Sequence, residues 1–256
     1  MQAGLNLFSV KNLLTTEEDF FNTVLKLKEM GYTYLQFSGA EFVPLRIKRV
    51  SEELNMPICL THVPMERIID DTQELMAEHA LFGCKNIGLG MMPFATVANE
   101  KEFKDTVEKL NKAGEEMAKN GFKFFYHHHH SEFFKHGKQT AFDYMVETAP
   151  YINFTIDTYW LQFGGMDIKD TLRKLKGRIE CAHLKDYQIS YTEGGQPRPF
   201  APECAPLGDG VLNFPEIVEV MKESGVQYFL VEQDNASRLP DTLAQVKRSI
   251  DYLKTI

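Results

Sequence analysis

Four consecutive histidines follow a run of aromatic residues near the middle of the chain. Phe124–Tyr126 lead directly into His127–His130, and Glu132 comes two positions later. The aromatic part is typical of a buried β-strand, in which alternate side chains share a face, so His127 and His129 should project together. Such a cluster is costly to bury unless it binds a metal or a polar substrate. A purification tag is disfavoured because the run is internal and continues a strand; a solvated loop stays open as the alternative.

The elements that would position these histidines repeat along the chain as strand followed by helix. This alternation predicts a parallel sheet, and eight such units in 256 residues predict a closed (β/α)₈ TIM barrel as a single domain over residues 1–256. The alternative fold, a doubly wound open sheet, is disfavoured because no glycine-rich nucleotide-binding motif follows the first strand. Expected strands are 4–10, 32–37, 58–63, 85–89, 122–128, 152–156, 178–183 and 227–231. Expected helices are 15–30, 43–55, 66–82, 97–120, 138–148, 168–176, 214–224 and 240–254.

Ionisable residues stand at the ends of the last four expected strands, where barrels of this kind build their active sites. In chain order they are His127, His129 and Glu132, then Asp157, then His183, then Glu232. The set of Glu132, Asp157, His183 and Glu232 has three carboxylates that would repel one another without a cation between them. Oxygen ligands with one imidazole suit Mn²⁺, Mg²⁺ or Co²⁺ better than a structural zinc. The sequence therefore predicts a divalent-metal site on this rim.

Three further residues are candidates for contact with a substrate. His62 ends the third expected strand and should line the pocket. Trp160, the only tryptophan, could stack on a sugar ring or pack in the core or a lid. Lys185 could reach a substrate oxygen or form a salt bridge with Asp186 or Glu232. By contrast, His79 on a helix and His136 in a loop are expected at the surface.

Composition excludes several classes of protein. The formal net charge of −8 argues against a nucleic-acid-binding surface. No apolar run approaches the ~20 residues that span a bilayer, and the N-terminus lacks the pattern of a signal peptide. The four cysteines show no C-x-x-C spacing; those at 59, 84 and 181 should be buried, and a reducing cytoplasm is the simplest setting.

Residues 186–210 should form a long polar loop, which we interpret as a functional lid.

Several motifs together resemble the sugar phosphate isomerase/epimerase family, the xylose isomerase-like barrels. The similarity is greatest to the branch with a Y-H-N-H-x-x-E-F signature, which includes inosose dehydratase-like and keto-sugar-processing members. The signature occupies residues 126–133, with His128 where asparagine is usual; further similar stretches are 157–160, 164–167, 183–186, 206–210 and 231–234.

The resemblance also implies roles for single residues. Glu132, Asp157, His183 and Glu232 would bind a divalent metal, most often Mn²⁺, with Mg²⁺, Co²⁺ or Zn²⁺ as alternatives. His129, with His127 beside it, would face the substrate. Related epimerases place a ligand glutamate near the position of His127, so the ligand from the fifth strand stays open among His127, His129 and Glu132.

These observations predict a metal-dependent isomerase or epimerase that moves a proton next to the carbonyl of a sugar or keto-sugar through a metal-stabilised enediolate. Glu232 with His129 or Glu132 would be the base and acid, and Lys185 would hold a substrate oxygen. With no phosphate clamp evident, an unphosphorylated sugar is expected, and a homo-oligomer is a further expectation. Alternatives are an inosose dehydratase-type lyase, a non-catalytic sugar-binding or regulatory subunit, and a phosphodiesterase.

Overall fold

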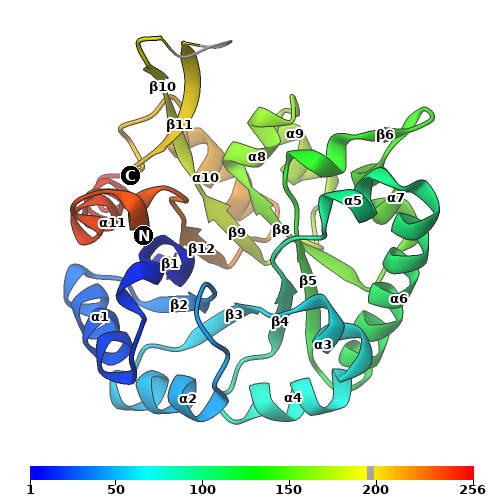
Figure 1. Cartoon of the computed structure of the whole chain (residues 1–256), viewed down its shortest axis with the longest axis horizontal. Helices are drawn as coiled ribbons and strands as arrows, with labels where there is room; N and C mark the ends of the chain where they lie inside the picture. Colours follow the sequence, from blue (N-terminus) through cyan, green and yellow to red (C-terminus); the bar gives the residue numbers. More distant parts are fainter. Residues whose placement is uncertain (195–198) are drawn as a thin grey trace.

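A closed barrel of eight parallel strands forms the centre of the molecule (Figure 1). The computed structural model describes residues 1–194 and 199–256. Each barrel strand pairs with the next along the chain, and the last pairs with the first, which confirms the predicted (β/α)₈ TIM barrel. In order around the barrel the strands are β1 (Gly4–Asn6), β2 (Tyr34–Phe37), β3 (Ile58–His62), β4 (Asn86–Leu89), β5 (Lys123–His127), β8 (Ile152–Asp157), β9 (Cys181–Leu184) and β12 (Tyr228–Val231).

Helices surround the barrel at the predicted places, with local differences. The helix expected over 66–82 is two helices that meet at Asp71, and the one expected over 97–120 is preceded by a short helix that ends where Asn99 caps the longer one. The helix directly after β8 was not predicted from the sequence. The α-helices are α1 (Glu17–Met30), α2 (Pro44–Glu53), α3 (Met65–Asp70), α4 (Thr72–Ala80), α5 (Phe94–Ala98), α6 (Glu100–Lys119), α7 (Ala141–Thr148), α8 (Thr158–Phe163), α9 (Ile168–Lys174), α10 (Phe214–Glu223) and α11 (Thr242–Leu253).

Short 3₁₀ helices adjoin three of the strand ends. The first expected strand is only three residues long, because Asn6 accepts a hydrogen bond from the Phe8 N–H and begins a 3₁₀ helix there. These helices are η1 (Leu7–Leu13), η2 (His130–Phe133) and η3 (Ala236–Arg238). Among the described residues, none of the helices has both the length and the apolar character needed to cross a bilayer.

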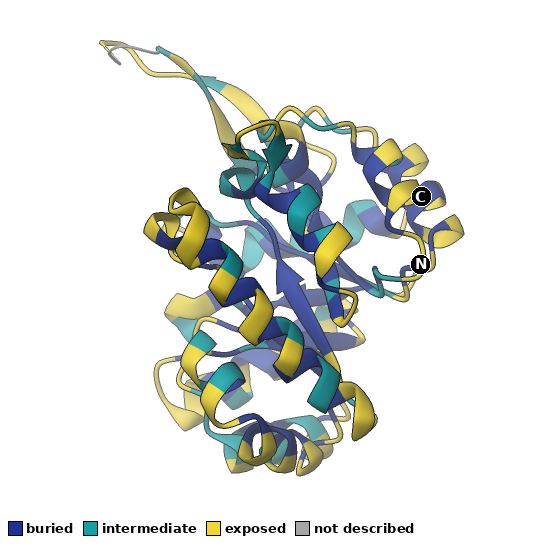
Figure 2. Ribbon diagram, turned by 90° about the vertical axis from the view of Figure 1, so that its right-hand side faces the viewer, coloured by how far each residue is buried: buried dark blue, intermediate teal, exposed yellow. Residues whose placement is uncertain are grey.

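The barrel interior is built in layers because strand side chains alternate between faces. A small apolar cluster fills one level, with members from five strands: Tyr34, Leu60, Phe125, Cys181 and Leu230. Two positions further along the same strands, and therefore on the same face, stand Gln36, His62, His127, His183 and Glu232. The apolar level thus forms the floor on which the polar level rests. A larger apolar core lies between the barrel and the helices, whose outward faces are exposed (Figure 2).

The long polar loop expected over 186–210 is largely an antiparallel hairpin. Its strands are β10 (Asp186–Tyr191) and β11 (Phe200–Ala205), which extend away from the barrel (Figures 1 and 2). Residues 195–198 of the expected loop lie outside the described residues. A second, very short hairpin, β6 (Lys135–His136) with β7 (Gln139–Thr140), precedes α7.

His79 is fully buried, so the prediction that it lies at the surface was wrong. One ring nitrogen is 2.7 Å from Thr61 Oγ1 and the other is 2.7 Å from the Leu75 carbonyl oxygen, while the ring stacks on Phe42. Burial lowers the pKa of His79 to about 4. The apolar helix face that carries it packs against β3, and the two hydrogen bonds satisfy the neutral ring.

This burial predicts a loss of stability in mild acid. The pKa of His79 is lower in the folded chain than in the unfolded chain, so protonation favours unfolding and stability falls as pH drops from about 6.5 to about 4. His79 alone should account for at most about 3 kcal/mol of that loss. Urea unfolding of the wild type and of His79→Gln across this range measures it. The advantage of the wild type should shrink toward pH 4, and parallel curves for the two proteins would contradict the prediction.

Candidate metal centre

Four buried side chains converge at the carboxyl ends of neighbouring strands. They are His127 from β5, Asp157 from β8, His183 from β9 and Glu232 directly after β12, and one ligand atom from each lies within 4.8 Å of the others. His183 Nδ1 is 2.7 Å from Glu232 Oε2 and 3.1 Å from His127 Nε2. Asp157 Oδ2 is 3.4 Å from His127 Nε2 and 3.7 Å from His183 Nδ1. We call these four residues the ligand cluster.

Three of the four ligands predicted from the sequence are in this cluster, but Glu132 is not. The chain leaves strand geometry after His127, and η2 turns the Glu132 carboxylate back onto its own segment. There it accepts hydrogen bonds from the Tyr126 hydroxyl (2.8 Å), the His129 N–H (2.7 Å) and the Ser131 hydroxyl (3.0 Å). Glu132 therefore caps η2, and His127 occupies the fourth position of the cluster in its place. We revise both roles predicted for Glu132, metal ligand and acid–base catalyst, accordingly.

Each member of the ligand cluster has its second polar atom held by another group, which leaves the first atom pointing inward. This pattern is typical of metal sites, in which outer partners fix the tautomer and the orientation of each ligand. His127 Nδ1 contacts the Gly90 carbonyl (3.0 Å), and Asp157 Oδ1 accepts the Trp160 N–H (3.0 Å). His183 Nε2 contacts Gln36 Oε1 (2.6 Å), and Glu232 Oε1 accepts from Asn6 Nδ2 (2.9 Å).

The buried ammonium of Lys185 adjoins the cluster and compensates its negative charge. Lys185 Nζ lies 2.9 Å from Asp157 Oδ2, 3.1 Å from Glu232 Oε2 and 3.0 Å from Asp234 Oδ1. Burial lowers the pKa of Lys185, but the three carboxylates outweigh it and raise the pKa well above the usual range. Burial raises the pKa of Glu232, but His183 and Lys185 outweigh it and hold the carboxylate ionised.

The histidines of the site fall into two electrostatic groups. Burial lowers the pKa of His62 and of His127 to about 3, and that of His129 to about 2, so these rings are neutral. Burial also opposes the charge on His183, but Glu232 and Asp157 outweigh it and raise its pKa to about 9. The carboxylates of Glu232 and Asp157 would therefore stabilise either a proton or a metal ion on Nδ1 of His183.

The residues present fit a divalent cation. Glu232 Oε2 is buried and, within the described structure, lacks a well-aimed hydrogen bond, although two cationic nitrogens lie close to it. Such an oxygen is costly to bury unless a cation takes its lone pair. Two imidazole nitrogens and two carboxylate oxygens, instead of the expected three carboxylates and one imidazole, suit Mn²⁺, Co²⁺ or Zn²⁺, with Mg²⁺ favoured less.

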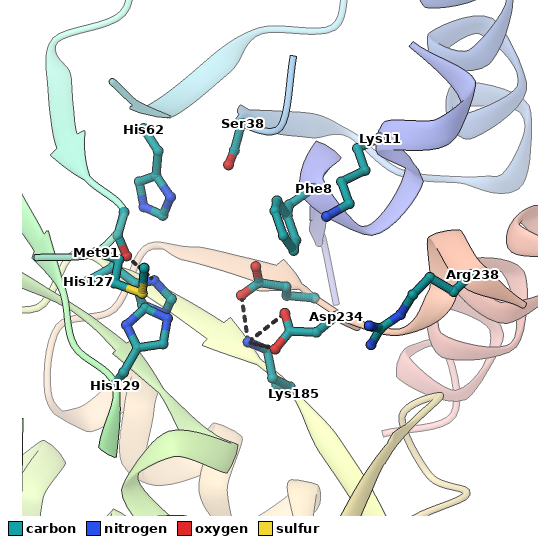
Figure 3. A pocket seen from close by; sticks show the side chains of 12 residues that line it. Phe8, Lys11, Ser38, His62, Met91, His127, His129, Lys185, Asp234 and Arg238 are labelled. Atoms are coloured by element: carbon teal, nitrogen blue, oxygen red, sulfur yellow. Dashed lines mark hydrogen bonds and ion pairs between the residues drawn. The ribbon is translucent and has the colours of Figure 1, made fainter. Parts of the chain in front are cut away.

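A cavity of about 450 Å³ opens above the cluster (Figure 3). In this view His62 and Ser38 lie at the upper left and centre, Phe8 and Lys11 at the upper right and Arg238 at the right, with Lys185 and Asp234 below them. His127, His129, Met91, Gly90 and Glu232 complete the lining. Of the residues predicted to meet a substrate, His62, His127, His129, Lys185 and Glu232 line this cavity. Lys11, Arg238 and Ser38 were not predicted from the sequence, and Asp234 was noted there only as part of the motif over 231–234.

The neighbouring histidines follow the expected alternation. His127 and His129 reach the cavity, whereas His128 points away, accepts the Asp157 N–H on Nε2 (3.1 Å) and packs against Phe142. His128 therefore joins β5 to β8 and has a structural role. Trp160 lies behind His129, with ring centroids 5.1 Å apart, and is not part of the cavity lining. This position favours a packing role for Trp160 and does not support the sugar-stacking role that was also considered.

Asp186, from the motif over 183–186, contacts the motif over 206–210 and does not line the cavity. The Asp186 carboxylate accepts backbone N–H groups from Tyr187 (2.9 Å), Gly208 (3.1 Å), Gly210 (3.2 Å) and Leu212 (3.2 Å). Gly208 has φ +86°, a conformation that favours glycine. Asp186 thus ties the base of the β10–β11 hairpin to the chain that leaves it, directly next to Lys185.

Comparison with known families identifies the chain's relatives. The model of the family described as xylose isomerase-like TIM barrel matches residues 24–256. The chain belongs to this family. Its known members include isomerases, epimerases and dehydratases that act on small molecules, as the predicted resemblance to sugar phosphate isomerase/epimerases implied.

The individual relatives are distant in sequence. An inosose dehydratase of Clostridium perfringens is 27% identical over 172 residues, which are 62% of this chain and 56% of that protein. The chain thus matches little more than half the length of this curated relative. A sugar phosphate isomerase/epimerase from Parabacteroides distasonis superposes with a TM-score of 0.81 at 25% identity, covering 100% of this chain and 98% of that one. An L-ribulose 3-epimerase structure has a TM-score of 0.68 at 14% identity, covering 100% and 94%, which shows a common fold.

Proposed function

We propose that the protein is a divalent-metal-dependent isomerase or epimerase of a sugar or keto-sugar, which moves a proton next to a carbonyl. The observation that carries this proposal is the placement of Glu232 and Lys185. Both side chains belong to the buried charge network of the ligand cluster, and both line the cavity. A base, a cationic donor and a candidate cation site therefore meet where one substrate could contact all three.

The roles of the chain's own residues follow from their charges. Glu232 is ionised and accepts the proton from the substrate carbon, then returns it to the neighbouring carbon in an isomerisation, whereas an epimerisation requires a second acid that delivers a proton to the opposite face. Lys185 stays an ammonium, oriented by Asp234, and donates hydrogen bonds to the substrate oxygen on which charge develops. His129 is neutral, so it orients a substrate hydroxyl and does not act as a charged acid. A divalent cation held by His127, Asp157, His183 and Glu232 would act as a Lewis acid toward substrate oxygens.

Hydrogen–deuterium exchange tests this function even when the product is unidentified. The metal-loaded protein is incubated in D₂O with ketoses, keto-sugars and cyclitol ketones, and NMR follows the carbon next to each carbonyl. We expect deuterium to enter at least one substrate, and removal of the metal with EDTA to slow the exchange by about 10² or more. Exchange at the full rate after metal removal would defeat the proposal.

A dehydratase is the second candidate, favoured by the similarity to inosose dehydratase. Dehydration of a cyclitol ketone begins with the same proton abstraction, so Glu232 and Lys185 would keep their roles and a hydroxyl would then leave. Mass spectrometry of the same incubations separates the two reactions, because only the lyase product has lost water. Metal affinity without exchange into any sugar would favour a non-catalytic sugar-binding protein.

A further inference from the structure

A single buried amide links the ligand cluster to the cavity wall. Gln36 on β2 is fully buried in the barrel interior. Its side-chain oxygen lies 2.6 Å from His183 Nε2, and its side-chain nitrogen lies 2.9 Å from His62 Nε2. One glutamine therefore contacts a candidate metal ligand and a cavity-lining histidine at the same time.

The chemistry of His183 determines which way this amide must point. His183 Nδ1 faces Glu232 Oε2 at 2.7 Å, so it carries either a metal ion or a proton. In the metal-bound state Nε2 keeps the ring hydrogen, because an imidazole with a lone pair on one nitrogen is protonated on the other, and in the structure Nε2 lies 2.6 Å from an amide oxygen, which can only accept. Gln36 must therefore present its oxygen to His183, as the structure shows.

The orientation of the amide in turn determines the state of His62. The amide nitrogen of Gln36 is left to donate to His62 Nε2, which must offer a lone pair. The hydrogen of the neutral His62 ring is therefore on Nδ1. Gly90 leaves this nitrogen uncovered, since a Cβ at that position would lie 2.9 Å from it. His127 stacks on the ring, with centroids 5.3 Å apart, and holds it in place.

We propose that Gln36 is a positioning residue that fixes His62 as a hydrogen-bond donor, through Nδ1–H, to an oxygen atom of the bound sugar or keto-sugar. The substrate oxygen that meets His62 is then a carbonyl or hydroxyl acting as acceptor, and His62 is not a proton-accepting base. This role rests on the proposed function for the identity of the ligand. The tautomer of His62 follows from the contacts of Gln36 alone and does not depend on the proposed function.

Nuclear magnetic resonance of the substrate-free protein reads the tautomer directly. Protein labelled with ¹⁵N-histidine is loaded with Zn²⁺, and long-range ¹H–¹⁵N correlation spectra are assigned with a His62→Phe variant. We expect the His62 hydrogen on Nδ1 in the wild type. In Gln36→Glu both carboxylate oxygens accept, so His62 should gain a hydrogen on Nε2. In Gln36→Leu the preference for Nδ1 should disappear.

Asn86→Leu serves as the matched control, because it removes another buried barrel amide whose nitrogen donates to the Cys59 carbonyl (2.9 Å). Its His62 spectrum should equal that of the wild type. A wild-type His62 with its hydrogen on Nε2 would overturn the proposal, as would unchanged His62 spectra in the Gln36 variants. If Gln36→Leu fails to fold, the wild type and Gln36→Glu still decide the question.

The kinetic consequence is measured separately on any substrate that the exchange experiment identifies. Loss of one donor should raise KM about tenfold in Gln36→Glu. A protein that exchanges no sugar but shows the expected tautomers would defeat the proposed function and leave the role of Gln36 standing. A protein that exchanges deuterium into a sugar but carries the His62 hydrogen on Nε2 would support the proposed function and overturn the role of Gln36.

Discussion

Glu232→Gln is expected to reduce turnover of the sugar substrate by about 10³-fold or more. Glutamine has nearly the shape of glutamate but can neither accept the proton nor hold a cation as an anion. The change also leaves Lys185 with one fewer carboxylate at 3.1 Å and His183 without its anion at 2.7 Å. Steady-state rates on the substrate found by deuterium exchange measure the loss, and isothermal titration measures the accompanying fall in affinity for Mn²⁺.

Glu216→Gln is the matched control, since Glu216 is exposed on α10 and pairs with Lys169 at 2.8 Å. It should leave both rate and metal affinity unchanged. If Glu232→Gln retained more than about a tenth of the wild-type rate, Glu232 could not be the base.

Lys185→Met should destabilise the metal-free protein by about 3–5 kcal/mol. Methionine fills a similar volume but leaves the buried Asp157 and Glu232 and the partly exposed Asp234 without the ammonium that lies about 3 Å from each. A divalent cation would supply the missing positive charge. Urea unfolding should therefore show a larger gain in stability from Zn²⁺ for Lys185→Met than for the wild type.

Lys174→Met provides the comparison for this variant. Lys174 is exposed and pairs with Asp143 at 2.7 Å, so its removal should change stability little, with or without Zn²⁺. A metal-free Lys185→Met protein as stable as the wild type would show that the three carboxylates do not need the ammonium.

The barrel could be predicted from the sequence because each strand–helix unit has its own local hydrophobic pattern. Eight such units in a row are compatible with few topologies other than a closed barrel. The same reasoning located Asp157, His183 and Glu232, since the carboxyl ends of parallel strands share one rim. It placed Glu132 incorrectly because alternation applies only while the chain remains a strand. After His127 the chain turns into η2, where a carboxylate at the third position caps the helix.

The groups that orient the ligands could not be predicted in the same way. Asn6 and Gln36 each stand as a single polar residue within an apolar strand, which signals an interior partner but does not name it. Gln36 meets His183 across the barrel, from a strand 147 residues away in the chain. Such a pairing is determined only by the closure of the barrel and the register of its strands, which the local sequence does not encode. Burial of His79 was missed for a similar reason, because its partner Thr61 lies on a different element.

The two halves of the barrel contribute unequally to the site. The second half, from β5 to β12, supplies all four members of the ligand cluster, whereas β1, β2 and the end of β4 supply Asn6, Gln36 and Gly90. The seam between first and last strands is short, with Gly4 paired to Leu230 and Leu5 to Val231. Fraying at this seam would withdraw Asn6 from Glu232 and disable the centre while most of the fold persists, so activity should be lost at a lower temperature than secondary structure.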